Sequence, residues 1–167
     1  FSSSFDITKE NRNIDNYSSL PQQRRALIDV GIVKYWHHGQ PRERFFLNEA
    51  STGLAAEIVD AWKSLPKGLG KSANSALRTA AAYKALSNHR NKKVRLQVGN
   101  EVESISICAI MVSNGRYCAD GMLIAPHASL NDGLLNAIVI SHVSRFEILK
   151  IRPALYTGNH VKHPKIR

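Results

Sequence analysis

The sequence predicts an α+β domain, mainly an antiparallel β-sandwich-like arrangement with two or three appended helices. Two strand patterns with hairpin spacing come first, two helical patterns follow, and several further strands then succeed one another with turns between them. This order is typical of an antiparallel sheet with helices added, and it lacks the regular alternation of strand and helix that builds a parallel sheet. The length of 167 residues fits one domain with a sizeable core.

The chain opens on a polar stretch and a hairpin. Residues 1–24 are rich in Ser and Asn and show little periodicity, so we expect a connection from a preceding domain, with the domain itself over residues 25–167. Arg25–Tyr35 has the β-branched bias of a strand. Turn residues fill positions 37–41, and Arg44–Asn48 is the expected partner strand.

Three segments have helical patterns. Apolar residues recur at helical spacing over Leu54–Leu65, directly after Ser51-Thr52-Gly53. The alanine-rich segment Ser72–His89 is a strong helix former with a Ser at its start. A third helix is expected from the cap Ser144 through about Ala154, and Gly158 would stop it.

Three further segments are predicted strands. Lys93–Val98 alternates strictly between polar and apolar residues, which indicates a half-buried strand. Glu103–Ser113 becomes continuously apolar, as expected of a central strand that is covered on both faces. Leu134–Val143 is another apolar strand, and it follows a Gly-containing loop.

Composition limits the class of protein. No apolar run approaches the ~18 residues that a membrane-spanning helix needs. Cys108 and Cys118 are too few for a disulfide framework, and neither has a second ligand at the spacing of a zinc site. His37 and His38 lie in a turn without a carboxylate at ligand spacing, which gives no support for a metal hydrolase. We expect a reducing, cytoplasmic environment, with a peripheral position at the membrane.

The positive charge is unevenly distributed. The net charge is +10, and residues 61–100 contain no acid. Such a stretch favours contact with an anionic membrane, nucleic acid or acidic partner, whereas a solvated helical face with ordinary surface lysines would look the same. Aromatic residues are sparse there, and a stacking platform for nucleic acid needs them. The candidates for the membrane-facing side chains are Lys63, Lys67, Lys71, Lys92 and Lys93.

The stretch 114–139 is the most informative for chemistry. It holds a Gly-containing loop, Pro126 and one acid, Asp132, followed by Gly133. An acid held in a tight turn beside free backbone carbonyls can ligate a hard cation such as Mg2+. Asn-Asp-Gly is equally an ordinary hairpin turn. The residues alone leave both interpretations open.

The same stretch resembles the C-terminal domain of the diacylglycerol kinase-like lipid kinases, a family that includes sphingosine kinases and bacterial lipid kinases. The resemblance rests on several elements in order and covers roughly residues 25–167. Their positions are Ile28-Asp29-Val30-Gly31, Phe46 to Gly53, Asn114-Gly115, Gly121-Met122, Pro126, Ala128, Asp132-Gly133 and Arg152 to His160.

The resemblance implies roles for particular residues. Asp132 corresponds to the Mg2+-coordinating acid of the family, and Ser129 and Leu134 fall on the other ligand positions, through oxygens that can be main-chain. Asp29 corresponds to an acid that faces the cleft between the two domains and supports catalysis. Asn48 and Asn114, in the shared motifs, are candidates for the substrate cleft.

The resemblance also implies a function for a larger protein. The expected activity is ATP-dependent phosphorylation of a lipid hydroxyl, with this chain supplying the lipid-side wall and a structural Mg2+ site. The family's phosphate-binding Gly-Gly-Asp-Gly-Thr motif and its general base, a Glu in an Asp-Gly-Glu turn, are absent from this sequence. We therefore expect a fragment that holds ATP mainly through a missing domain and is inactive alone, although a degenerate intact protein would look similar.

The lipid that would be phosphorylated and the oligomeric state are not predicted by the sequence. Two other functions stay open. One is a kinase of the NAD kinase type that acts on a soluble substrate, and the other is a basic nucleic-acid-binding module.

Overall fold

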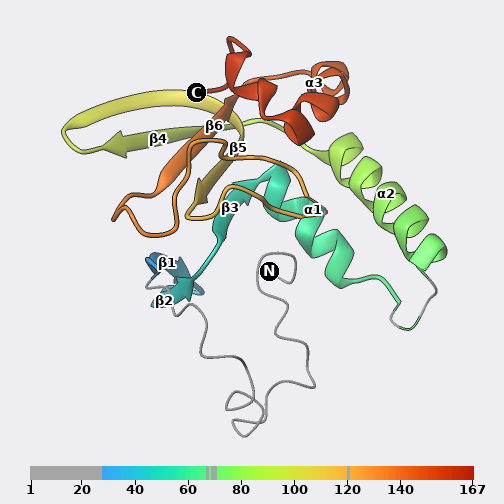
Figure 1. Ribbon diagram of the computed structural model, residues 1–167, viewed down its shortest axis with the longest axis horizontal. Coiled ribbons are helices and arrows are strands. Elements are labelled where there is room, and N and C mark those ends of the chain that lie inside the picture. The colour runs from blue at the N-terminus through green and yellow to red at the C-terminus, as the bar shows by residue number, and fades with distance from the viewer. Residues whose placement is uncertain (1–27, 67, 69–70, 120) are drawn as a thin grey trace, which may run out of the picture.

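The computed structural model describes residues 28–66, 68, 71–119 and 121–167, and it confirms the α+β class with antiparallel sheets (Figure 1). The expected connection over residues 1–24 lies outside the described residues. The elements in chain order are β1 (Gly31–His37), β2 (Gln40–Phe46), β3 (Glu49–Gly53), α1 (Leu54–Lys63), α2 (Lys71–Asn88), β4 (Lys92–Val98), β5 (Glu101–Ser113), β6 (Asn136–Ser141), α3 (Arg145–Thr157) and a 3-10 turn, η3 (Asn159–Lys162).

The first sheet is the predicted hairpin, with shifted bounds. β1 pairs with β2 from Gly31 opposite Phe46 to His37 opposite Gln40, so the turn is only His38-Gly39. The expected strand Arg25–Tyr35 was wrong at its start, because residues 28–30 are not in a strand and 25–27 lie outside the described part. The backbone of residues 28–30 has other hydrogen-bonding partners, which belong to the candidate site.

The second sheet has four strands around β5. β5 is long enough to pair with β4 over one half, from Glu101 to Ile107, and with both β3 and β6 over the other. The expected strands near 93–98, 103–113 and 134–143 are confirmed as β4, β5 and β6. β3 was missed, because Glu-Ala-Ser-Thr-Gly has no apolar alternation and owes its strand form to pairing with β5.

The three predicted helices are confirmed. α1 begins without a side-chain cap after Gly53, where a Cβ atom would lie 2.4 Å from the Cys108 carbonyl oxygen, so the close approach to β5 requires glycine. α3 begins with a capping box in which Ser144 and Glu147 bond each other's backbone amides. α1 and α2 lie at the side of the sheet opposite the β4–β5 turn (Figure 1). None of the described helices has the length and apolar character needed to cross a membrane.

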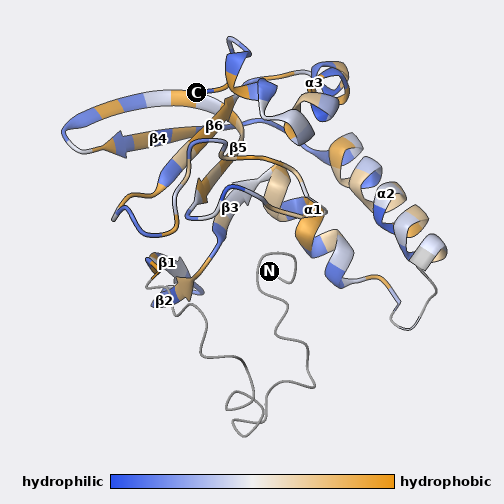
Figure 2. Cartoon of the chain, viewed as in Figure 1, coloured by the Kyte–Doolittle hydropathy of each residue, from blue (hydrophilic) through white to orange (hydrophobic). Residues whose placement is uncertain are grey.

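The core lies where β5 and β6 pair and the helices cover them. Hydrophobic residues run along both strands in this region (Figure 2). His160 is 1% exposed, and its Nε2 lies 2.9 Å from the Ile124 carbonyl oxygen, so the chain after α3 is tied to the loop before β6. The central buried cluster is Leu54, Leu86, Cys108, Ala109, Met111, Ile124, Ala125, Ala128, Ile138, Ile140, Val143, Ile151 and Ile166.

The start of α3 generates a pH-dependent prediction. Lys165 donates to the Glu147 carboxylate at 2.5 Å, and the Ser144 amide donates to it at 2.7 Å. These bonds lower the pKa of Glu147 from its usual value to about 2. A depressed pKa stabilises the fold above the unfolded-state pKa, and that stability is lost as the pH falls from about 5 toward 2. Glu147→Gln should therefore be less stable than the parent chain near pH 6, with a difference that shrinks toward pH 3.

Urea unfolding at several pH values measures this difference. Glu101→Gln, which removes an exposed carboxylate at the β4–β5 turn, is the matched control and should show no such trend. A Glu147→Gln deficit that stays constant from pH 6 to pH 3 would contradict the assignment of the ion pair.

Candidate functional site

The turn before β6 carries the predicted acid. Asp132 is exposed, and its Oδ1 accepts a hydrogen bond of 3.0 Å from the amide of Leu134. Gly133 between them has φ +73°, a conformation that favours glycine. The Ser129 hydroxyl donates to Oδ1 of Asn131 at 3.0 Å. Hydrogen bonds within the turn, made by the side chains of Asp132 and Ser129, thus stabilise its conformation.

Asp29 is bound to this turn across a long sequence separation. Its Oδ2 accepts from the amide of Gly133 at 2.7 Å, and its own amide donates to the Leu130 carbonyl at 2.7 Å. A carboxylate that accepts from a backbone amide makes a charge-assisted bond, which is stronger than a neutral one. The structure therefore brings Asp29 next to the turn of Asp132.

Asn114 holds the backbone of Asp29 in place from the interior of the domain. Its side-chain amide donates to the carbonyls of Asp29, at 2.8 Å, and Leu47, at 3.0 Å. Its backbone amide donates to the carbonyl of Asn48 at 2.7 Å, and the Asn48 side chain donates to the Tyr117 carbonyl at 3.0 Å. Asn114 is 0% exposed and Asn48 9% exposed, so both act from inside as cross-links between loops. Their role in a substrate cleft stays a prediction.

Several buried oxygen atoms around Asn114 have no hydrogen-bonding partner among the described residues. They belong to the side chains of Asn48, Glu49, Ser113 and Asn114. Burial raises the pKa of Glu49, and a hydrogen bond with Cys118 opposes part of that rise. Burial and the neighbouring Glu49 raise the pKa of the Cys118 thiol. Water or a bound group with donors or positive charge would pair these oxygens.

Glu49 was missed by the sequence analysis. Glu49 lies within the shared motif Phe46 to Gly53, but no role was predicted for it. Its burial could not be predicted from the sequence, because it results from the pairing of β3 with the buried end of β5.

The predicted Mg2+ ligands fit a hard cation in donor type. Within the described part of the chain, no three His, Cys, Asp or Glu side chains gather as a metal site. The predicted set has a single carboxylate, Asp132, together with main-chain oxygens. Among the described residues the carbonyls of Ser129 and Leu134 accept no hydrogen bond, so both oxygens stay available. An all-oxygen set of this kind suits Mg2+.

Two of the lysines predicted to face a membrane form ion pairs with acidic residues of α1. Lys63 lies 3.0 Å from Asp60, and Lys92 lies 3.9 Å from Glu57, one turn earlier on the helix. Both lysines are about 70% exposed, with 71% and 68%, and such exposed pairs contribute little energy. Lys93 is exposed on β4. Lys67 and the side chain of Lys71 lie outside the described residues.

The chain matches a family model, a curated protein and a solved structure. The family model described as "YegS C-terminal NAD kinase beta sandwich-like domain" matches residues 52–167. The protein named "Probable lipid kinase YegS-like" of Chromohalobacter salexigens is 26% identical over 124 residues, which is 74% of this chain. The chain spans only 36% of that relative's length. A solved structure of a proposed diacylglycerol kinase from Bacillus anthracis str. Sterne has a TM-score of 0.45 at 14% identity, over 84% of this chain and 43% of that one.

The buried amide of Asn114 gives a stability prediction. Asn114→Ala leaves the carbonyls of Asp29 and Leu47 without their donor, and an unpaired buried polar group costs about 1–3 kcal/mol. The free energy of unfolding, measured in urea, should fall by that amount. Gln97→Ala, which removes an exposed amide on β4, should change it by less than about 0.5 kcal/mol. Equal losses in the two variants would show that Asn114 does not support the site.

Proposed function

This chain belongs to the family of YegS C-terminal, NAD kinase β-sandwich-like domains, and we propose that it is the lipid-side domain of an ATP-dependent lipid kinase. The observation that carries the proposal is the bond from the Gly133 amide to Asp29, because it brings the two predicted acids to one turn. The relative named as a lipid kinase supports the same activity. The activity belongs to the whole protein, and this chain contributes one wall of its cleft.

The proposed mechanism assigns positioning to this domain. Phosphoryl transfer depends mainly on alignment and on neutralisation of charge. Asp132 and the carbonyls of Ser129 and Leu134 would hold Mg2+, which supplies positive charge that orders the boundary between the two domains. Asp29 holds the turn in place by accepting from the Gly133 amide through Oδ2, and its other carboxylate oxygen, Oδ1, lies beside the turn. A further domain would hold ATP, and a Glu outside this chain would take the proton of the lipid hydroxyl.

Apolar side chains beside the two acids favour a lipid substrate. Val30 is 49% exposed next to Asp29, and Leu134 and Leu135 are 64% and 43% exposed after the Asp132 turn. Exposed apolar residues gathered at one place are typical of a binding surface. Acyl chains would cover them when the lipid hydroxyl approaches the acids.

The membrane role of the basic residues belongs to the same proposal. A lipid kinase works at a membrane surface, where each basic group contributes about 1 kcal/mol near anionic lipids. Lys93 is exposed, and Lys63 and Lys92 are exposed despite their ion pairs with Asp60 and Glu57, which cost little to break. The protein would then be cytoplasmic and peripheral at the membrane.

A kinase with a soluble substrate is the second candidate. The description of the matching family includes the NAD kinase β-sandwich, which favours this alternative over a nucleic-acid-binding module. The exposed apolar residues around Asp29 and Asp132 favour the lipid kinase, because a dinucleotide substrate would not need them.

A kinase assay of the whole gene product tests the proposal. Asp132→Asn should lower the transfer of radiolabelled phosphate from ATP to lipid by about 10–100-fold, the range found when the support of a metal site is lost. Diacylglycerol, sphingosine, ceramide and NAD are the substrates to compare, and thin-layer chromatography separates their products.

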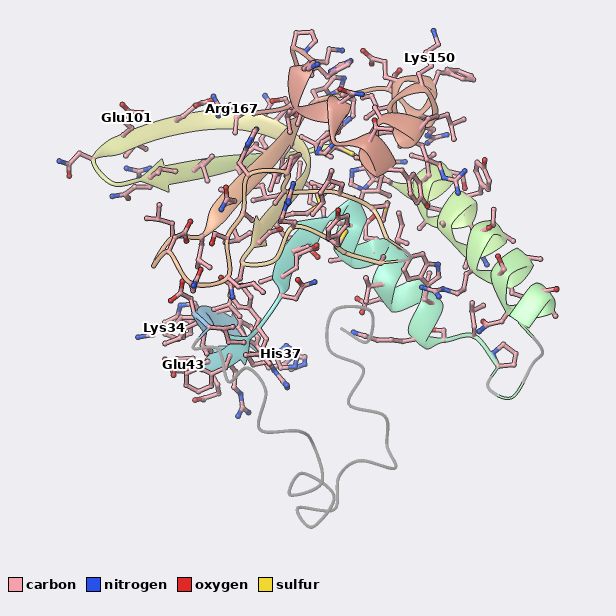
Figure 3. The ribbon with its side chains drawn as sticks, in the orientation of Figure 1. Lys34, His37, Glu43, Glu101, Lys150 and Arg167 are labelled. Carbon is pink, nitrogen blue, oxygen red and sulfur yellow. The ribbon has the colours of Figure 1, made fainter. Side chains whose placement is uncertain are left out.

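Glu101→Gln is the matched control, because it removes one exposed carboxylate at the β4–β5 turn (Figure 3). It should keep full activity. Phosphorylation of NAD alone would reject the lipid substrate, and unchanged activity of Asp132→Asn would reject the cation site.

A further inference from the structure

A second candidate site lies at the other end of β6. A cavity of about 350 Å³ opens where the C-terminal end of α2, the start of β4 and the start of α3 meet. The turn of Asp132 precedes β6 and this cavity follows it, so six strand residues, roughly 20 Å, separate them. The cavity is therefore distinct from the proposed cation turn.

His89 carries an unpaired buried nitrogen at this cavity. Its side chain is 5% exposed, and Nδ1 lies 2.7 Å from the Glu57 carboxylate. A carboxylate only accepts hydrogen bonds, so Nδ1 carries a proton. Nε2 is buried and has no hydrogen-bonding partner among the described residues. Oδ1 of Asn91, which also lines the cavity, is buried without a partner in the same way.

The charge of the cavity is positive. Arg90 and Arg145 line it and are exposed, and neither has a salt-bridge partner in the described part of the chain. His142 also lines it, and none of the lining residues is acidic. The nearby acids are engaged elsewhere, Glu57 with His89 and Lys92, and Glu147 with Ser144 and Lys165. The N-terminal end of α3 adds the positive end of its dipole.

The rest of the lining is apolar. Leu86, Cys108 and Val143 are 8%, 1% and 4% exposed and belong to the buried part of the wall. Phe146, in the first turn of α3, is 77% exposed at the same cavity. An exposed aromatic residue beside cationic side chains is the pattern of a surface that enters the headgroup region of a membrane.

We propose that this cavity binds the phosphate group of an anionic membrane lipid, between Arg90, Arg145 and the free nitrogen of His89. A small rotation of the buried His89 ring would bring Nε2 to the cavity. A phosphate oxygen then pairs Nε2 in either state, because the imidazolium N–H donates to it and the neutral nitrogen accepts from a P–OH group. The volume accommodates a headgroup with the first part of its chains, and Phe146 contacts the hydrocarbon boundary. The proposal needs no kinase activity, and it adds a recognition site to the general attraction of exposed lysines.

Sedimentation with vesicles tests the proposal on the 167-residue chain. Vesicles of phosphatidylcholine with phosphatidic acid should bind the chain, and pure phosphatidylcholine should bind it far more weakly. Arg90→Gln with Arg145→Gln should bind the anionic vesicles about tenfold more weakly than Lys150→Gln with Arg152→Gln. The second pair removes the same charge from exposed positions further along α3, where Lys150 projects away from the domain (Figure 3).

His89→Asn separates recognition from net charge. The asparagine amide lies near the position of Nδ1 and can keep the bond to Glu57, but it leaves no group at the position of Nε2. The variant should therefore also weaken binding to phosphatidic acid, with circular dichroism confirming the fold. The arginine variants change exposed residues, so the test does not depend on whether His89→Asn folds. Equal losses in the two double variants would overturn the proposal. Soluble glycerol 3-phosphate binding as tightly as the vesicle lipid would overturn its assignment to a membrane lipid.

Discussion

The arrangement of the candidate site depends on the contact between Asp29 and the turn of Asp132. The Gly133 amide donates to the Asp29 carboxylate, and the Asp29 amide donates to the Leu130 carbonyl. Asp29 precedes the β1–β2 hairpin and Gly133 precedes β6, so these bonds link the two segments through which the chain enters the two sheets. Asn114 holds the other side of Asp29 by donating to its carbonyl, and it is fully buried. Without these bonds the turn that carries Asp132 would not be held beside Asp29, and the proposed cleft would lose this corner.

The two ends of β6 carry opposite chemistry. Its N-terminal end follows the turn that holds Asp132 and carbonyl oxygens that accept no hydrogen bond within the described part of the chain, and this arrangement suits a cation. Its C-terminal end leads into a cavity lined by Arg90, Arg145 and two histidines, and this lining suits an anion. β6 itself is buried over Ile138–Ile140 and paired with the central strand β5. A rigid, buried strand between two polar ends keeps the two sites at a fixed separation, because packed interiors deform little. The proposed reaction and the proposed membrane contact would then take place at separate positions on one domain.

The sequence was most predictive where the pattern was long. The helix near 54–65 and the strand Lys93–Val98 follow from periodicity, which depends only on local burial. The helix near 72–89 follows from its alanine-rich composition. β3 could not be found, because five mostly polar residues become a strand only when β5 is there to pair with them. The motifs pointed to Asp29 and Asp132, but the bond that links Asp29 to the turn of Asp132 joins Asp29 to Gly133, 104 positions away, and no local pattern contains that information. The orphaned Nε2 of His89 was equally invisible, since it results from packing between α1, α2 and α3.

The central claim is that the turn of Asp132 holds a hard cation, and paramagnetic broadening by Mn2+ tests it most directly. Mn2+ takes the same oxygen ligands as Mg2+ and broadens the resonances of nearby nuclei. In a titration followed by amide NMR, the signals of residues 129–134 should broaden first in the parent chain, and this selectivity should disappear in Asp132→Asn. Broadening that spares residues 129–134, or that is the same in the parent chain and the variant, would show that this turn is only a bend between strands.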